Sequence, residues 1–269
     1  MTRRSFDERW ADAVHEELAA EAAARDRAQA PAPTPVLAVA DLARLPEPVR
    51  RYVSASGVVG RPVPRNMRVD CDAVMRRKPG ETGMQATSTQ LNGFARTRRL
   101  FLMRARMFGL PVRALHLYQG DAATFQVRVA GLATIVDMAG DEISRAETVT
   151  VLNDLCVLAP GALTDDRLAW EPLDDRSAAV AFTNGRWTVR ARLLFNERDE
   201  LVDFWSDDRP ESADGGLVAR RWSTPISDYR VIDGLRLPTH GEAVYARPEG
   251  PFTYGEFTIR SIEYDVADA

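Results

Sequence analysis

Residues 139–161 read AGDEISRAETVTVLNDLCVLAPG, and the apolar residues of this stretch recur at intervals of three and four. That interval is the period of one face of an α-helix. The residues that follow it are Ile143, Ala146, Val149, Leu152, Leu155, Cys156 and Ala159. Asp141 and Glu142 suit the positive N-terminal end of a helix, and Pro160-Gly161 is a stop signal. The spacing predicts one long helix over residues 141–158.

On both sides of this helix the chain has the pattern of strands joined by short turns. Val69, Cys71, Ala73 and Met75 alternate with polar residues, and Trp187, Val189, Ala191, Leu193 and Phe195 do the same, which is a period of two. Turn signals punctuate these runs, with Asn92-Gly93 and Asn184-Gly185 as hairpin signals. Sequential hairpins indicate antiparallel pairing. We therefore predict an α+β fold, a large curved antiparallel β-sheet (an open half-barrel) wrapped around one long helix.

The N-terminal 30 residues have a pattern of their own. Phe6, Trp10, Val14 and Leu18 form one apolar stripe, and Ser5 with Glu8 is a capping-box pair. Residues 31–39 follow as a Pro-rich linker. We expect an amphipathic helical appendage at 1–30 and a half-barrel domain at 40–269. The stripe would pack on the body or on a second subunit, so a homodimer through this helix stays open. Few contacts should cross the linker, so the body should fold without residues 1–33.

Composition excludes several classes of protein. Hydrophobic residues make up 45% of the 269 residues and charged residues 28%, which is ordinary for a globular domain. The net charge of −4 does not favour nucleic acid or an anionic membrane as a partner. There is no apolar run long enough for a membrane span, and residues 1–10 lead into no secretory signal. We expect a cytoplasmic location.

Metal-ligand spacings and phosphate-binding loops are both missing from the sequence, so no metal and no other cofactor is expected. The two cysteines, Cys71 and Cys156, lie too far apart for a CxxC site. We interpret them as two buried thiols, with a single disulfide as the alternative.

Four residues are candidates for catalysis. His240 and Glu242 are two positions apart on one strand face and can pair as an acid and a base. His116 lies in a strand, where a structural role is the alternative to a catalytic one. Asp154, on the predicted long helix, is the fourth candidate.

Aromatic and sulfur-containing side chains mark a candidate ligand site. The C-terminal strands carry Trp187, Trp205, Trp222, Tyr245, Tyr254 and Phe257, and an earlier strand carries Phe101 and Met103. An ordinary core is one explanation. A single curved sheet, however, has a wide concave face, and whatever the helices leave unfilled becomes an apolar cavity.

Residues 82–120 contain no acidic residue but several arginines. Alternation places Arg99 with Phe101 and Met103 on the apolar face, and Arg104 and Arg106 on the opposite, cationic face. Arg99 at the entrance end of the apolar face would hold a carboxylate or phosphate of a ligand. The alternative is a solvated sheet face whose arginines pair with acids of neighbouring strands.

Several longer motifs resemble those of a bacterial domain family of unknown function. They are Leu45-Pro46-Glu47-Pro48-Val49-Arg50-Arg51-Tyr52, Leu152-Asn153-Asp154-Leu155 before Pro160-Gly161-Ala162-Leu163, Leu168-Ala169-Trp170, Gly241-Glu242-Ala243-Val244-Tyr245 and Pro251-Phe252-Thr253-Tyr254. The resemblance covers about residues 40–266. It implies the LolA-like half-barrel of lipoprotein-carrier proteins, and no activity.

Three functions fit these features. The first is a cytoplasmic binder or carrier of a hydrophobic or amphipathic small molecule, anionic if Arg99 holds it. The second is a cofactor-free enzyme, a cyclase or isomerase of polyketide-like chains, because such a reaction needs mainly a shaped pocket. The third is a non-catalytic interaction module.

Overall fold

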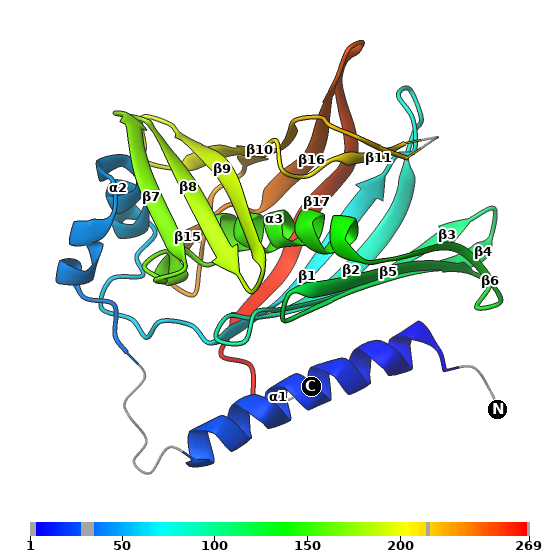
Figure 1. Ribbon diagram of the computed structural model, residues 1–269, viewed down its shortest axis with the longest axis horizontal. Helices are drawn as coiled ribbons and strands as arrows, with labels where there is room; N and C mark the ends of the chain where they lie inside the picture. The colour runs from blue at the N-terminus through cyan, green and yellow to red at the C-terminus, as the bar shows by residue number, and fades with distance from the viewer. Residues whose placement is uncertain (1–3, 28–34, 214–215, 268–269) are drawn as a thin grey trace.

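The computed structural model describes residues 4–27, 35–213 and 216–267, which form one large sheet with a long helix on each side (Figure 1). The helices are α1 (Phe6–Arg27), α2 (Glu47–Ala55) and α3 (Asp141–Leu158), with 3-10 turns at Val39–Arg44 and Pro160–Ala162. The strands are β1 (Asn66–Met75), β2 (Met84–Gly93), β3 (Arg98–Met107), β4 (Leu110–Gln119), β5 (Ala122–Val129), β6 (Ala133–Ala139), β7 (Leu168–Asp174), β8 (Ser177–Asn184), β9 (Trp187–Phe195), β10 (Leu201–Ser206), β11 (Glu211–Ala213), β12 (Gly216–Val218), β13 (Trp222–Ser227), β14 (Arg230–Ile232), β15 (Leu235–Leu237), β16 (His240–Arg247) and β17 (Gly250–Tyr264).

The chain fills the sheet in two passes. The strand order is β6-β5-β4-β3-β2-β1-β17-β16-β13-β10-β9-β8-β7, and neighbours are antiparallel throughout. β1 to β6 run from the centre to one edge, α3 crosses to the opposite edge, and the rest returns to the centre, where β17 pairs with β1. The two edge strands do not pair with each other, so the sheet is open. The predicted fold is confirmed.

Helix α3 lies in the hollow of the curved sheet (Figure 1), with contacts to β5, β6, β9 and β10. Its bounds, Asp141–Leu158, are those that the apolar spacing predicts. The predicted apolar residues Val149, Leu152 and Leu155 are buried, but so are polar residues such as Thr148 and Asp154. Because the helix lies in the hollow of the sheet, protein covers residues on both its apolar and its polar sides, while Asp141, Glu142 and Arg145 near its N-terminus stay exposed.

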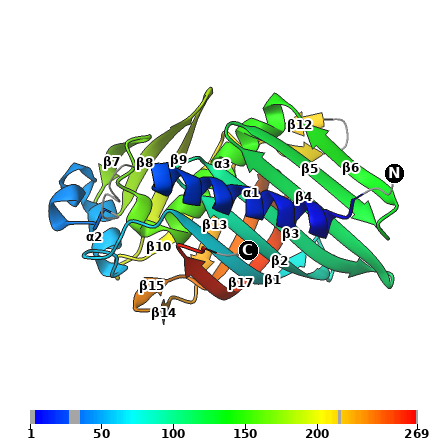
Figure 2. The ribbon, with the colours of Figure 1, turned by 90° about the horizontal axis from the view of Figure 1, so that it is seen from below.

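Helix α1 covers the outer face of the sheet, running over β3 and β4 (Figure 2). Its predicted stripe is buried against a matching apolar stripe on that face, made of Leu91, Leu100, Leu102 and Leu115. The indole nitrogen of Trp10 also donates a hydrogen bond to the Leu100 carbonyl, at 3.1 Å. The expectation that few contacts join this helix to the body was therefore wrong. The stripe packs on the body, which leaves the homodimer prediction without its proposed contact.

The outer sheet face is not the solvated cationic face that alternation predicts. Leucines occupy much of it, and acids of α1 pair with three of its arginines, whereas the exposed Arg106 donates to the Gly109 carbonyl. Asp7 accepts from Arg104 at 2.8 Å and from Arg113 at 3.4 Å, and Glu17 accepts from Arg98 at 2.9 Å. The pairing acids thus come from a distant helix instead of neighbouring strands.

Two local predictions meet different outcomes. The capping box at the start of α1 is confirmed, since the Glu8 amide donates to Ser5 Oγ at 3.1 Å and the Ser5 amide donates back to the Glu8 carboxylate at 2.8 Å. The Asn92-Gly93 hairpin was wrong, because both residues belong to β2 and pair with Arg99 and Arg98. The turn comes after them, at residues 94–97.

Residues 31–34 of the predicted linker lie outside the described residues. The end of the linker is attached to the body: the Val63 amide donates to the Pro35 carbonyl at 2.8 Å, and the Leu37 amide donates to the Arg61 carbonyl at 2.9 Å. Residue 39 already begins a 3-10 turn. The division into an appendage and a half-barrel domain stays a prediction.

Candidate functional site

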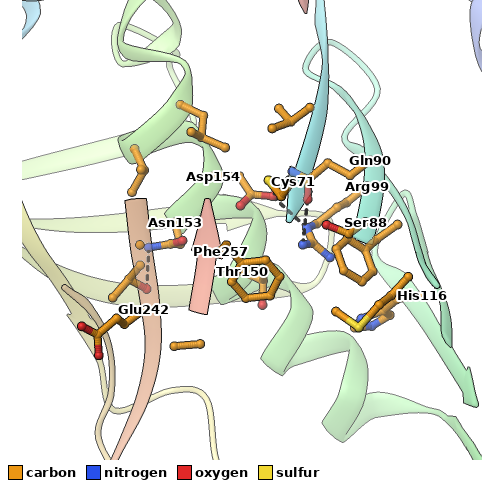
Figure 3. Close-up of a pocket in the computed structure, with 18 of the residues that line it drawn as sticks. Cys71, Ser88, Gln90, Arg99, His116, Thr150, Asn153, Asp154, Glu242 and Phe257 are labelled. Carbon is orange, nitrogen blue, oxygen red and sulfur yellow. Dashed lines mark hydrogen bonds and ion pairs between the residues drawn. The ribbon is translucent and has the colours of Figure 1, made fainter. Parts of the chain in front are cut away.

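A cavity of about 250 Å³ lies between the concave face of the sheet and α3 (Figure 3). Strands β1 to β5 form one wall, α3 a second, and β13, β16 and β17 a third. The volume is slightly below the roughly 300–1,000 Å³ typical of small-molecule sites. The curvature that places α3 in the hollow therefore also leaves space beside it, as the sequence predicts for a wide concave face.

The cavity brings together six of the predicted ligand-binding residues: Arg99, Phe101, Met103, Trp222, Tyr254 and Phe257. They come from both halves of the sheet, which are joined by the β1–β17 pair. The remaining wall is mainly apolar and includes Val69, Met75, Val157, Ile226 and Ile259. Alternation along β3 explains why Arg99, Phe101 and Met103 share this inner face.

Three predicted ligand-binding residues lie outside the cavity wall. Trp187 donates its indole N–H to the Asp121 carbonyl at 2.7 Å, and Trp205 packs under the guanidinium of Arg221, 3.7 Å from its ring centre. Tyr245 stacks behind Tyr254, with ring centres 5.2 Å apart. Their part in ligand binding stays a prediction, but none of the three side chains lines this cavity. For Trp205 the reason is its parity, because its neighbour Phe204 is the side chain that faces the core.

A buried charge cluster forms one side of the cavity (Figure 3). Arg99 Nε donates to Asp154 Oδ2 at 2.7 Å, and Arg99 Nη1 donates to Glu147 Oε1 at 2.7 Å. Arg99 Nη2 donates to Gln90 Oε1 at 3.0 Å. Asp154 Oδ2 also accepts from the amides of Gln90, at 3.0 Å, and Asn92, at 2.9 Å. The arrangement fixes two carboxylates of α3 to strands β2 and β3.

The predicted role of Arg99, a free cation that holds an anionic head group, does not fit this cluster. Each of its three guanidinium nitrogens already donates to a protein oxygen, and the residue is only 8% exposed. Two carboxylates face its single charge, so a third would meet net repulsion. Asp154 is likewise held as a structural carboxylate by three donors.

His116 lies at the edge of the charge cluster. Its Nε2 is 3.4 Å from Glu147 Oε2, yet this buried nitrogen has no hydrogen-bond partner among the described residues. Burial lowers the pKa of His116 to about 4, against the attraction of Glu147, so the ring is neutral at pH 7. Burial alone would raise the pKa of Glu147, but His116, Arg99 and Arg209 outweigh it and hold that pKa below its usual value.

We expect the stability of the protein to depend on His116 as the pH falls. The unfolded chain binds a proton at this ring near its ordinary pKa of 6.5, and the folded chain only near 4. Proton binding by His116 should therefore leave the free energy of unfolding unchanged well above pH 6.5. As the pH drops to about 4, it should lower that free energy by up to about 3 kcal/mol. Urea unfolding of wild type and His116→Phe between these pH values measures it.

The comparison with His116→Phe is needed because Asp203 also changes the stability of the protein with pH, in the direction opposite to His116. Burial raises the pKa of Asp203 to about 6, so its protonation stabilises the folded chain as the pH falls. Both proteins share this contribution, and their difference isolates His116. Parallel pH profiles for the two proteins would contradict the expectation.

The predicted acid–base pair of His240 and Glu242 does not form. Both side chains lie on the cavity wall, but each has a different partner on β17. His240 Nδ1 lies 3.3 Å from Thr258 Oγ1, and Glu242 Oε2 accepts from Thr253 at 2.9 Å. The carboxylate of Glu242 lies on the opposite side of the cavity from Arg99 (Figure 3). The two residues share a strand face and line the same cavity, as their spacing predicts, but their side chains do not hydrogen-bond to each other.

Sequence reasoning missed four residues on the polar side of the cavity: Gln90, Glu147 and Arg209, which line it, and Asn92, which donates a hydrogen bond to the lining residue Asp154. A signal for three of them was present. Glu147 and Asp154 are seven residues apart, which places them on one face of the helix. Ser88, Gln90 and Asn92 alternate along one strand face. Nothing in the pattern distinguishes Arg209 from the chain's other arginines.

The two cysteines are both free and buried, as predicted. Cys71 lies on the cavity wall, where burial raises the pKa of its thiol to about 12, so it is protonated and unreactive at neutral pH. Within residues 4–27, 35–213 and 216–267, no three His, Cys, Asp or Glu side chains gather closely enough to hold a metal ion. None of the helices in that part of the chain is both long and apolar enough to cross a membrane.

Comparisons with solved structures find seven chains of similar overall arrangement, two of which follow. A DUF1329 family protein from Desulfovibrio piger is 13% identical with a TM-score of 0.44, covering 82% of this chain and 92% of its own. A LolA superfamily protein from Nitrosomonas europaea is 11% identical with a TM-score of 0.41, covering 80% of this chain and 92% of its own. A comparison with curated proteins finds no match.

The sequence resemblance to a family of unknown function is confirmed by a match to a family's sequence model over residues 35–257. This range includes the sheet from β1 to β16, helix α3 and most of the cavity wall. Because the match spans well over half of the chain, the protein belongs to DUF6544, a family of unknown function.

Proposed function

We propose that the protein binds a hydrophobic or amphipathic small molecule in the cavity between the concave sheet face and α3. The observation that carries the proposal is the cavity itself, about 250 Å³ with mainly apolar walls and a polar cluster on one side. A space lined in this way takes a ligand with an apolar body and a few polar atoms. A core packed shut would instead have favoured an interaction module.

Binding without turnover fits the polar groups better than a cyclase or isomerase does. The two buried carboxylates, Glu147 and Asp154, both accept hydrogen bonds from Arg99. Such bonds favour the charged form of a carboxylate and disfavour its action as a general acid. The neutral His116 has a low pKa, which makes it a weak base at pH 7.

Native mass spectrometry of the protein purified from its own host tests the proposal directly. We expect a co-purifying small molecule that is lost on denaturation. Purification from the cytoplasmic fraction also tests the expected location, which stays a prediction. Conversion of that molecule during incubation with the protein would identify an enzyme instead of a binder.

Filling the cavity should abolish binding. Ala114 lies on the cavity wall, so we expect Ala114→Phe to weaken binding of an apolar fluorescent probe by at least about tenfold. The cost to stability should stay within the roughly 1–3 kcal/mol that overpacking produces. Fluorescence titration and urea unfolding measure the two effects. The matched control is Ala181→Phe, at a half-buried position of β8 outside the cavity wall. Equal probe affinity in Ala114→Phe and Ala181→Phe would contradict the proposed binding site.

A further inference from the structure

Arg209 is a second arginine on the cavity wall, and its surroundings differ from those of Arg99. No carboxylate of residues 4–27, 35–213 and 216–267 lies within ion-pair distance of its guanidinium. The acids next to it in sequence pair elsewhere: Asp208 with Arg145, and Glu211 with two other arginines, Arg220 and Arg247. Arg209 therefore presents a cation to the cavity with no opposite charge in contact.

The position of this guanidinium is nevertheless fixed from several sides. Its Nε donates to Thr150 Oγ1 at 3.2 Å, and its Nη1 donates to the hydroxyl of Tyr245. Its plane lies over the ring of Trp222, 4.6 Å from the ring centre. Nη2 has no protein acceptor among the described residues. Of the five guanidinium N–H groups, those of Nη2 and one of Nη1 stay available to a ligand.

A second polar group of the same cavity has no hydrogen bond to any described residue. Nε2 of His116 is buried, 3.4 Å from Glu147 Oε2, and has no hydrogen-bond partner within the described part of the chain, on a residue only 9% exposed. An unpartnered buried nitrogen is costly and is found where a water or a ligand completes the site. His116 and Arg209 both line the cavity, and the positive charge of Arg209 helps to lower the pKa of His116.

Resting on the proposed function, we infer that Arg209 binds the carboxylate of an amphipathic ligand whose apolar body lies against the sheet. The planar guanidinium matches a carboxylate with paired N–H donors. The charges of Arg99, Arg209, Glu147 and Asp154 sum to zero, and the half-buried Glu242 adds one negative charge on the far wall. The single positive charge of Arg209 matches a monocarboxylate, whereas a dianion such as a phosphate monoester would place a second, unmatched negative charge near Glu147 and Glu242. The modest volume favours medium-chain acids.

The test compares decanoate and dodecanoate with their methyl esters, which keep the chain and remove the charge. Isothermal titration of the wild-type protein should show the acids binding about ten- to a hundredfold more tightly than the esters, the effect of one charge-assisted contact. In Arg209→Gln the acids should lose their advantage, so that the ratio of acid affinity to ester affinity falls to about one. Arg209→Lys should retain part of the preference, because it keeps the charge without the planar donors.

The matched control is Arg221→Gln, which removes the same charge from an arginine that stacks on Trp205 and pairs with Asp207 outside the cavity. It should leave the preference for acids intact. Equal binding of acids and esters to wild type would overturn the role of Arg209 and leave the proposed cavity function standing. Failure of the wild-type protein to bind either class would overturn both. The wild-type comparison needs no variant, so it decides the matter even if Arg209→Gln does not fold.

Discussion

Replacing Arg99 with methionine should lower the free energy of unfolding by about 3–5 kcal/mol, the cost of removing one partner from a buried ion pair. The variant leaves Glu147 and Asp154 buried without the cation that both contact. Methionine fills much of the same space, so the loss reflects charge more than packing. Urea unfolding at pH 7 measures it.

Two further variants separate the effect of the buried charges from that of losing any arginine. Arg104→Met removes a pair with Asp7 whose side chains are 35% and 46% exposed, and it should cost no more than about 1 kcal/mol. The triple variant Arg99→Met, Glu147→Gln, Asp154→Asn has no unpaired charge left, so it should recover much of the stability. Equal losses for Arg99→Met and Arg104→Met would refute the buried-pair account.

Deleting residues 1–33 should leave a folded body with markedly lower stability. The core cluster around α3 contains no residue of α1, so the sheet keeps its main source of stability. Deletion exposes the outer leucine stripe, including Leu91, Leu100 and Leu102. We expect a loss of at least about 3 kcal/mol, which is the cost of removing a single buried tryptophan. Urea unfolding measures the loss, and circular dichroism reports whether the sheet persists.

Point variants of α1 check that the loss comes from its apolar stripe. Trp10→Ala should reproduce a large part of it, because Trp10 is 8% exposed. Glu16→Ala, at an exposed position of the same helix, should change little. A truncated protein as stable as the full chain, with no binding of a dye for exposed apolar surface, would show that α1 contributes nothing to the body.

Patterns that depend on short-range periodicity predicted the fold well. The bounds of α3 and the alternation of β9 follow from local spacing, and the capping box is a contact between residues three apart. Antiparallel pairing follows from short turns, which join strands that are neighbours in sequence. These features require no knowledge of which distant segments meet.

The site could be predicted only in part, because it depends on long-range contacts. Alternation placed Arg99 on the inner face correctly, but its partner Asp154 lies on a helix that the pattern does not align with β3. Arg99 contacts two carboxylates and Arg209 contacts none among the described residues, yet nothing in the sequence around the two arginines distinguishes them. The same limit hid the pairing of Arg104 with Asp7, ninety-seven positions away.

The joining of β1 to β17 at the centre of the sheet has a consequence for the order of folding. Hairpins such as β3–β4 can form as soon as their strands leave the ribosome, but Met67 pairs with Tyr264 near the end of the chain. Pairings between residues so distant in sequence form slowly. During synthesis β1 is therefore an unpaired edge, open to association with other chains until the last strand arrives. The β1–β17 pair at the centre of the finished sheet is therefore an exposed strand edge while the protein is being made.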